Sequence, residues 1–330
     1  MRARESRTAS VPEYRELPVV PDAPKGSSWG LWGPDDVFGC LNLLGPQSVS
    51  DGIASVQDSR VFNVNLELEL PSPPLFSRSS FRHVVHDVGI GHDDELVDWN
   101  TQSSSQWDGF RHLKHPAWGF YNGVADEDHG IHHWARRGIA GRGVLADVER
   151  WRASAGRPID AGTPDEISVE DLRSTLEAQS TEVRTGDLLL IRTGWVSWYR
   201  TLDVAGRAEV ATTSLRSSCG LTKGRSTAKA LWNLHIAAVA ADNPALEATP
   251  FGSWDPDHMA TWRDDPEAAA DTMLHFSLLA LLGLPIGELF DLDALAEDCA
   301  ADGRYTFLLT SAPLNLAAGV ATPPNALAIK

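Results

Sequence analysis

Apolar and polar residues recur along the chain in patterns that predict both strands and helices. Alternation from Arg60 predicts a half-buried strand over 60–70. Apolar runs led by turns predict further strands at 142–148, 186–195 and 304–314. Helical patterns cover 168–179, 271–283 and 291–303, and a helix is predicted to pass into a buried strand over 227–243.

The ends of these helices have residues that favour capping. Ser168 precedes acidic residues and is a predicted N-cap. Gly283 suits the position just after a helix, and Gly303 ends the helix from Asp291. Strands and helices follow one another without strict alternation, which predicts one α/β domain with more than one sheet and flanking helices. Residues 1–28 are charged and Pro-rich and are predicted to form an arm, with residues 29–330 as the single domain.

Composition narrows the classes of function. The 330 residues are 42% hydrophobic, which is enough for a substantial core. The net charge of −17 argues against binding to nucleic acid or to an anionic membrane, since both need a basic surface. No apolar run reaches the roughly 18 residues of a membrane span. Cys40, Cys219 and Cys299 form no CxxC pair and no export signal is visible, so we expect a cytoplasmic protein with reduced thiols.

Common catalytic and nucleotide-binding motifs are absent. The sequence holds no P-loop, GxGxxG, GxSxG or HExxH motif. The segment "GIAGRG" from Gly138 is predicted to be a turn before a strand. The cluster of His129, His132 and His133 is predicted to be a polar loop rather than a zinc site, because no spaced partner completes a ligand set. His83 and His86 would be separated by the alternation of a strand.

The segment "NTQSSSQWDGFRHLKH", residues 100–115, carries the candidate chemistry. In an extended chain Gln102, Ser104, Gln106 and Asp108 project to one side. In a helix Gln102 would neighbour Gln106, and Asp108 would neighbour His112. Either arrangement brings an acid, amides and an imidazole together. The apolar wall of a substrate pocket is predicted to come from Trp99, Trp107 and Trp118. The alternative is a buried polar network that holds a loop, and His115 is given no role.

Two later polar residues lie among apolar ones. His275 falls on the apolar stripe of the helix predicted over 271–283, so it is predicted to be buried and to need a partner. It is either a core histidine bonded to backbone or part of a site. Glu288 sits in "LPIGELFDL" and is paired, caps the next helix or binds a cation. A helix followed by a turn could bring the two together.

These segments resemble the cyclase family, the kynurenine formamidase and isatin hydrolase superfamily, whose signature is H-x-G-T-H-x-D-x-P-x-H. The matching segment is Gln102 to His112, with Gln102 and Gln106 in place of the two histidines and Phe110 in place of the proline. It is similar to a "QWDGxRH" subgroup. Further segments that resemble family blocks are "WGLWGPDDVFGCLNLL", "GDLLLIRTGW", "AAVAADNPALE", "LLGLPIGELFDL" and "ADGRYTFLLTSAPL".

The resemblance implies a swivelling β/β/α fold of mixed sheets with flanking helices, assembled into homodimers or homotetramers. It implies that Asp108 binds a metal ion, that His112 transfers protons, and that His275 and Glu288 are later metal ligands. Gln106 would join them as a weak ligand. Such an oxygen-rich set shifts preference from Zn²⁺ toward Mn²⁺, Mg²⁺ or Ca²⁺. The two glutamines leave open a site without metal.

Three functional hypotheses follow. The first is a hydrolase of a small cyclic or aryl amide or lactone, with a metal-activated water and His112 as general acid and base. Gln102 and Gln106 would bind the substrate and donate hydrogen bonds to the developing oxyanion. The second is a metal-free cyclase, lyase or isomerase of a specialised metabolite, with Asp108 orienting His112. The third is a small-molecule binder on the same fold without catalysis.

Overall fold

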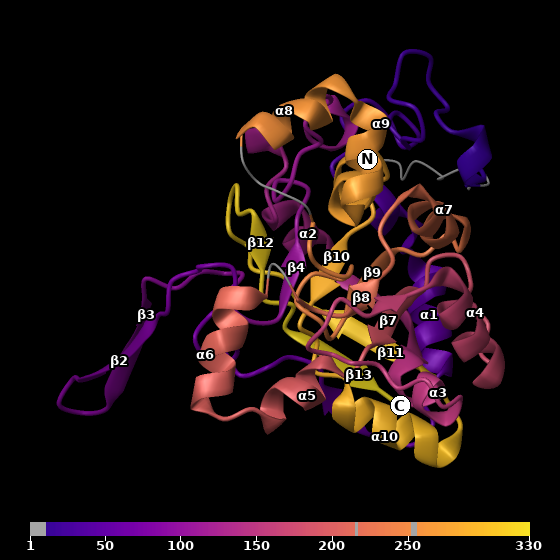
Figure 1. Cartoon of the computed structure of the whole chain (residues 1–330). Coiled ribbons are helices and arrows are strands. Elements are labelled where there is room, and N and C mark those ends of the chain that lie inside the picture. Colours follow the sequence, from indigo (N-terminus) through magenta and orange to yellow (C-terminus); the bar gives the residue numbers. More distant parts are fainter. Residues whose placement is uncertain (1–10, 215–216, 252–255) are drawn as a thin grey trace.

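A nine-stranded mixed sheet forms the centre of the molecule in the computed structural model, which describes residues 11–214, 217–251 and 256–330 (Figure 1). Its strands, in spatial order, are β1 (Val61–Asn63), β13 (Ala326–Ile329), β11 (Thr306–Ser311), β5 (Ile139–Asp147), β7 (Leu188–Arg192), β9 (Ala238–Ala241), β10 (Ile286–Glu288), β4 (Gln106–Asp108) and β12 (Ala321–Thr322). Two small sheets pair β2 (Arg82–Asp87) with β3 (His92–Val97) and β6 (Glu166–Ile167) with β8 (Gly220–Leu221).

The middle of the large sheet is parallel, with β5, β7, β9 and β10 side by side. Every residue of β7 and of β9 is buried, as expected for parallel strands covered on both faces. Antiparallel strands flank this parallel centre on both sides. The predicted α/β fold with mixed sheets and flanking helices is therefore confirmed.

Helices surround the sheet and connect its parallel strands (Figure 1). They are α1 (Pro46–Ala54), α2 (His132–Arg137), α3 (Val148–Ser154), α4 (Val169–Ala178), α5 (Trp195–Thr201), α6 (Val204–Thr213), α7 (Arg225–Asn233), α8 (Pro256–Asp264), α9 (Pro266–Thr272) and α10 (Asp293–Asp302). Ser168 caps α4 as predicted, since its hydroxyl accepts the Asp171 backbone N–H at 3.0 Å. None of the described helices combines the length and apolar character that crossing a bilayer requires.

Three predicted elements differ from the structure. Only Val61–Asn63 of the 60–70 segment pairs in a sheet, although Val64 and Leu66 continue inward as buried residues. The predicted turn at "GIAGRG" is limited to Gly138, because β5 begins at Ile139 and pairs along its length with β11 and β7. The helix predicted over 271–283 is interrupted at Met273, whose backbone is extended, and Phe276–Leu281 then forms a π-helix.

The described part of the predicted N-terminal arm lies against α7. The Trp232 indole N–H donates to the Pro12 carbonyl at 2.8 Å, and the Tyr14 backbone N–H donates to Asn233 Oδ1 at 2.8 Å. Leu17 belongs to the main hydrophobic core. Residues 11–28 thus contribute to the packing of the body, while the division at residue 28 stays a prediction.

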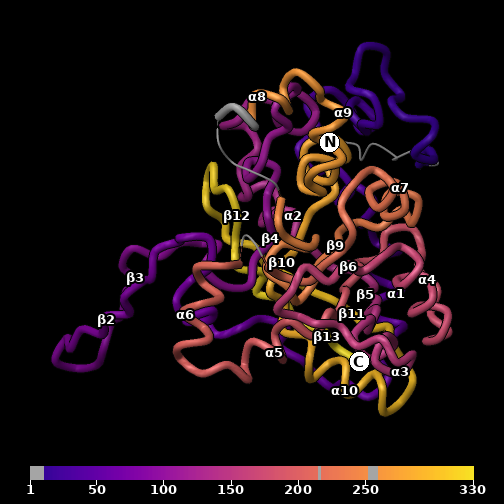
Figure 2. Tube along the Cα trace, in the orientation of Figure 1, coloured from indigo at the N-terminus to yellow at the C-terminus, as the bar shows by residue number. Residues whose placement is uncertain are grey.

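The β2–β3 hairpin projects away from the body, as Figures 1 and 2 show. Its two strands pair with each other over all six residues of each strand. Val85, Val88 and Ile90 are exposed on it. His83 and His86 lie in β2, where the strand separates them as predicted. The hairpin joins two segments that meet again at the candidate site, since Arg78 precedes it and Gln102 follows it.

Candidate active site

A pair of short antiparallel strands positions the polar side chains that the sequence singles out. β4 pairs with β10 in a register that places Gln106 opposite Glu288. Gln106 and Asp108 share one face of β4, and Trp107 lies on the other. Both polar residues are completely buried. The extended alternative is thus correct for Gln106 and Asp108, whereas Gln102 lies in the turn that precedes the strand.

Gln102 reaches back to the strand through its side-chain amide. Its Nε2 donates to Asp108 Oδ1 at 2.9 Å and contacts His112 Nδ1 at 3.0 Å. Both N–H groups of the amide are then engaged, and His112 Nδ1 is an acceptor. A neutral imidazole with an accepting Nδ1 carries its proton on Nε2. Gln102 therefore determines that Nε2 is the ring atom of His112 that is available to a substrate.

His275 lies between two carboxylates. Its Nδ1 is 3.0 Å from Glu247 Oε1, and its Nε2 is 3.1 Å from Glu288 Oε1. The same Nε2 is 3.7 Å from Asp108 Oδ2. The predicted burial of His275 is confirmed, because the residue is 2% exposed. Its partners are carboxylates rather than backbone, so the alternative of a core histidine bonded to backbone is excluded.

Gln106 is held between a cation and a carboxylate. Its amide Nε2 donates to Glu288 Oε2, and its Oε1 accepts from Arg78 Nη1 at 3.3 Å. The opposite orientation of the amide would place its oxygen against Glu288 and its N–H groups against Arg78. The one side-chain oxygen of Gln106 faces Arg78 in this arrangement, and the cation ligation predicted for Gln106 stays a prediction. The oxyanion role predicted for Gln102 and Gln106 also stays a prediction: both N–H groups of Gln102 are engaged with Asp108 and His112, and Gln106 Nε2 donates to Glu288.

Burial and neighbouring charges shift the pKa values of the site. Burial raises the pKa of Glu288 to about 7, and the charge of Asp108 adds to this shift. Burial lowers the pKa of His112, against the effect of Asp108, so its ring is neutral at pH 7. Burial also opposes charge on His275, but Glu247, Asp108 and Glu288 together raise its pKa well above the ordinary value. His275 is therefore an imidazolium when no cation replaces its proton.

These groups open onto a cavity of about 160 Å³, here called the inner cavity. His112, His275, Glu288 and Arg78 supply its polar lining. Its apolar lining consists of Phe76, Leu113, Pro244, Ala245, Phe251 and Met273. Arg78 is the one Lys or Arg side chain among the described residues that line it.

The three tryptophans predicted to form the pocket lie outside the inner cavity. Trp107 is fully buried on the opposite face of β4, where its indole N–H donates to Ser311 Oγ at 3.0 Å. Trp99 lines a separate surface cavity beside Ser104 and Ser105. Trp118 stacks on His115, with ring centroids 4.2 Å apart. Phe76 and Phe251 are the aromatic residues at the inner cavity instead.

The remaining histidines of interest have structural partners. His115 Nε2 bonds the Pro266 carbonyl at 3.2 Å, and His129 Nε2 bonds the Tyr121 carbonyl at 2.8 Å. His132 and His133 form the first turn of α2, so the polar loop predicted there is partly helical. Within the described ranges, the group of side chains spaced to hold a metal ion is Asp108, His112 and His275, not this histidine cluster.

The donor set at the inner cavity fits a divalent cation. Asp108 Oδ2 is buried and has no hydrogen-bond partner among the described residues. His275 Nε2 lies 3.7 Å from this oxygen and 3.1 Å from Glu288 Oε1, and His112 is a further donor spaced to share an ion with Asp108 and His275. Carboxylates and imidazoles are ligands for Mn²⁺ or Zn²⁺. Glu247 binds the other ring nitrogen of His275, as carboxylates commonly do behind a metal-binding histidine. Asp108, His275 and Glu288 could therefore hold the cation that the family resemblance implies.

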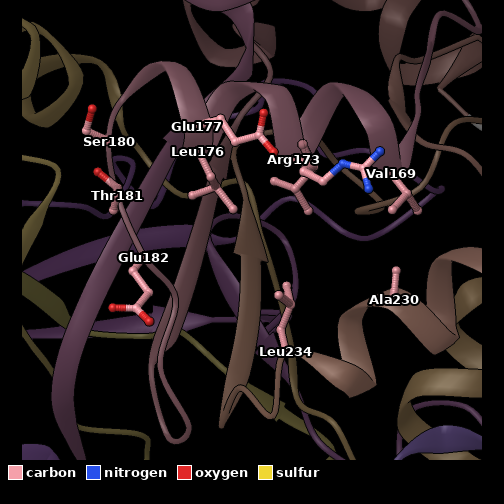
Figure 3. Close-up of a pocket in the computed structure, with 10 residues that line it drawn as sticks. Val169, Arg173, Leu176, Glu177, Ser180, Thr181, Glu182, Ala230 and Leu234 are labelled. Atoms are coloured by element: carbon pink, nitrogen blue, oxygen red, sulfur yellow. The ribbon is translucent and has the colours of Figure 1, made fainter.

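A larger cavity, of about 430 Å³, lies away from these groups between α4 and α7 (Figure 3). Leu172, Leu176 and Leu234 give it an apolar lining. Arg173, Glu177 and Glu182 are the charged residues at its edge. None of its lining residues belongs to the candidate site, so the cavity carries no part of the chemistry described above.

Comparison with known proteins identifies the family. The model of the cyclase family, described as "Putative cyclase", matches residues 39–248, which is more than half of the chain. The chain belongs to the cyclase family. The match to the cyclase model includes Gln102, Asp108, His112 and Glu247 and ends before His275. The family predicted from the sequence is confirmed.

Solved structures of a cyclase and of isatin hydrolases share the fold of this cyclase-family chain. A structure described as a novel cyclase is 29% identical, with a TM-score of 0.78 over 92% of this chain and 99% of the other. An isatin hydrolase bound to the product analogue thioisatinate is 17% identical, with a TM-score of 0.53 over 87% of this chain and 99% of the other. Isatin hydrolase A from Labrenzia aggregata, bound to benzyl benzoate, is 16% identical, with a TM-score of 0.51 over 86% and 97%. No curated protein matches the chain.

Two residues of the site were not predicted from the sequence of this cyclase-family chain. Arg78 lies in the irregular segment before β2, where no periodic pattern distinguishes it. Glu247 follows the apolar run that contains β9, and it is completely buried. An acid at the end of an apolar run is the same signal that drew attention to Glu288, so Glu247 could have been found in that way.

Proposed function

We propose that this protein is a hydrolase of a small cyclic or aryl amide or lactone, with a divalent cation held by Asp108, His275 and Glu288. The observation that supports it best is the buried Asp108 Oδ2, which has no hydrogen-bond donor among the described residues and faces His275 Nε2. A buried carboxylate oxygen without a donor is costly unless a cation binds it. The fold similarity to isatin hydrolases supports hydrolysis as the reaction class.

The residues around the inner cavity would have separate roles in this reaction. A bound divalent cation lowers the pKa of water and polarises a carbonyl group. His112 would act at Nε2, where the neutral ring holds its proton and would hydrogen-bond the leaving group. It would give up that proton only as the ring takes one from the attacking water, because an imidazolate would otherwise be left. Arg78 presents guanidinium N–H groups to the carbonyl oxygen, the role first predicted for the glutamines. Glu247 keeps the His275 ring in place.

Elemental analysis paired with hydrolysis assays tests this proposal. We expect stoichiometric Mn²⁺ or Zn²⁺ in protein purified without chelator, and hydrolysis of isatin, a formanilide or an aryl lactone that chelation removes and added metal restores. Glu288→Gln should lower metal affinity by at least about tenfold. Glu95→Gln is the matched control, because Glu95 pairs with a histidine on the exposed hairpin. A protein that holds no metal and does not respond to added ions would contradict the proposal.

The pH dependence of this activity should follow His112. Burial lowers the pKa of His112 below its ordinary value of about 6.5. The neutral ring needed for the Gln102 hydrogen bond therefore persists to lower pH than in a solvated histidine. We expect kcat/KM at saturating metal to be constant near neutrality and to fall as the pH drops through a pKa below about 6.5. An acid limb centred above pH 7 would contradict this assignment.

One observation favours a second candidate, a metal-free acid–base enzyme. The His275 imidazolium is hydrogen-bonded through both ring nitrogens, to Glu247 and to Glu288. It therefore neutralises much of the charge of these two carboxylates without a metal ion. In that case Asp108 and Gln102 would orient His112, which alone would exchange protons with the substrate. Turnover that is unchanged by exhaustive chelation, with no bound metal, would support this candidate over the first.

A further inference from the structure

A second chamber adjoins the inner cavity. This outer chamber has a volume of about 500 Å³, and His112 and Leu113 line both spaces. The inner cavity, at about 160 Å³, has room for little more than a reacting group and its immediate substituents. A substrate whose reacting carbonyl lies beside His112 would therefore place the rest of its body in the outer chamber.

The walls of the outer chamber suit a flat apolar body. Phe120, Trp262 and Phe276 line it, together with Pro116 and Met259. Trp262 and Phe276 meet edge to face, with ring centroids 5.5 Å apart and an interplanar angle of 71°. Both are buried, so their positions are fixed by packing and not by the ligand. Such rigid aromatic surfaces bind planar groups at small entropic cost.

The charged groups of the outer chamber are cationic. Lys114 and Arg263 line it, and no carboxylate does so among the described residues. This is unusual in a chain with 45 acidic and 28 basic residues. Arg225, by contrast, is paired with both Glu267 and Asp271. Among the side chains that the structure describes, no carboxylate forms an ion pair with Lys114 or Arg263.

From these observations we infer that the substrate carries an anionic group on an aromatic or similarly flat body. Lys114 and Arg263 would bind this anion in the outer chamber while the reacting carbonyl enters the inner cavity. A local positive potential in an otherwise acidic protein also favours the approach of anions over neutral analogues. The inference rests on the proposed function for the reacting end of the substrate and adds the chemical class of its other end.

Calorimetric binding of three probes of matched shape tests the inference without requiring turnover. The probes are 2-naphthoate, neutral 2-naphthamide and cationic 2-naphthylmethylammonium. We expect 2-naphthoate to bind about tenfold tighter than 2-naphthamide, and the cation to bind weakest. Raising the salt concentration from about 0.05 to about 0.5 M should weaken the binding of 2-naphthoate alone. Protein should be measured with and without chelator, so that carboxylate binding to a metal is recognised by its loss.

Two double variants test whether Lys114 and Arg263 form the anion-binding site. K114Q/R263Q should bring the affinities for 2-naphthoate and 2-naphthamide to within about twofold, and its thermal unfolding should match the parent because both side chains are exposed. R136Q/K229Q, which removes the same charge from exposed positions outside both cavities, should keep the tenfold preference.

Equal affinity of the parent for both probes would overturn the inference. So would a preference that survives in K114Q/R263Q, since Arg78 or a metal would then be the anion's partner. These outcomes are separate from the test of the proposed function. Tight binding of 2-naphthoate by a protein without hydrolytic activity would contradict the proposed hydrolase function but would still support the anion-binding site.

Discussion

Replacing His275 with alanine is expected to lower the free energy of unfolding by about 3–5 kcal/mol in metal-free protein at pH 8. The imidazolium is the shared partner of Glu247 and Glu288, both of which are almost completely buried. Its removal leaves two carboxylates without their main cation in a medium that solvates charge poorly. Denaturant unfolding followed by circular dichroism measures the difference.

The pH dependence of this loss distinguishes electrostatics from a simple packing defect. Burial raises the pKa of Glu288 to about 7 even though His275 lowers it, so removing His275 would raise this pKa further above its value in the unfolded chain. A carboxyl group with a raised folded-state pKa destabilises the protein increasingly as the pH rises from the unfolded pKa to the folded one. The deficit should therefore be smaller at pH 5 than at pH 8. H275A/E247Q should recover part of it, because one uncompensated charge is gone.

Ser277→Ala is a matched control for this prediction. Ser277 is as buried as His275 and lies in the same segment, but its hydroxyl donates one bond to the Ala270 carbonyl. Losing that bond should cost about 1 kcal/mol at either pH. A loss in H275A no larger than in S277A, or independent of pH, would contradict the view that His275 holds two buried carboxylates together.

The second large effect is expected at His112, where replacement with alanine should lower kcat by about 10²- to 10⁴-fold. His112 lines both the inner cavity and the outer chamber, and Gln102 leaves its Nε2 available for proton transfer. Asp108, His275 and Glu288 are unchanged in this variant, so any fall in its metal content would identify His112 as a further ligand, as its spacing to Asp108 and His275 allows. Steady-state kinetics on the substrate that the parent hydrolyses, together with elemental analysis, measure both quantities.

His83→Ala provides the comparison for His112→Ala. It also removes an imidazole paired with an aspartate, with Nε2 2.8 Å from Asp94 Oδ2, but on the exposed hairpin. We expect its kcat to equal that of the parent. If H112A kept full turnover, His112 would not be the proton-transferring group. If H112A and the parent both lacked turnover yet bound the naphthoate probe equally, the protein would be a binder without catalysis.

Local patterns predicted most of the fold and the place of the site. The buried strands β7 and β9 and the helices α4 and α10 were visible because their own residues carry the period or the caps that form them. Family blocks marked Asp108, His112, His275 and Glu288, and the structure brings all four together. The break at Met273 was not predicted, because the apolar stripe continues through it.

The finer arrangement of the site depends on contacts between distant segments, which no local pattern carries. Arg78 meets Gln106 from an irregular segment before the hairpin, and Glu247 meets His275 across 28 residues. The prediction for Trp107 failed for a different reason. An aromatic residue between two polar ones in a strand must point to the opposite face, so the alternation that correctly grouped Gln106 with Asp108 also excluded Trp107 from the cavity.

The hairpin formed by β2 and β3 leaves the body just after Arg78 and returns just before Gln102, where Arg78 donates a hydrogen bond to the Gln102 carbonyl. Its tip, from Val88 to Gly91, is exposed. A protease that cut there would produce two polypeptides, one carrying Arg78 and the other Gln102, Asp108 and His275. Because β1 of the first piece pairs with β13 of the second, the nicked protein should remain one particle. The cavity would then be shared between two polypeptides, each of which supplies part of its polar lining.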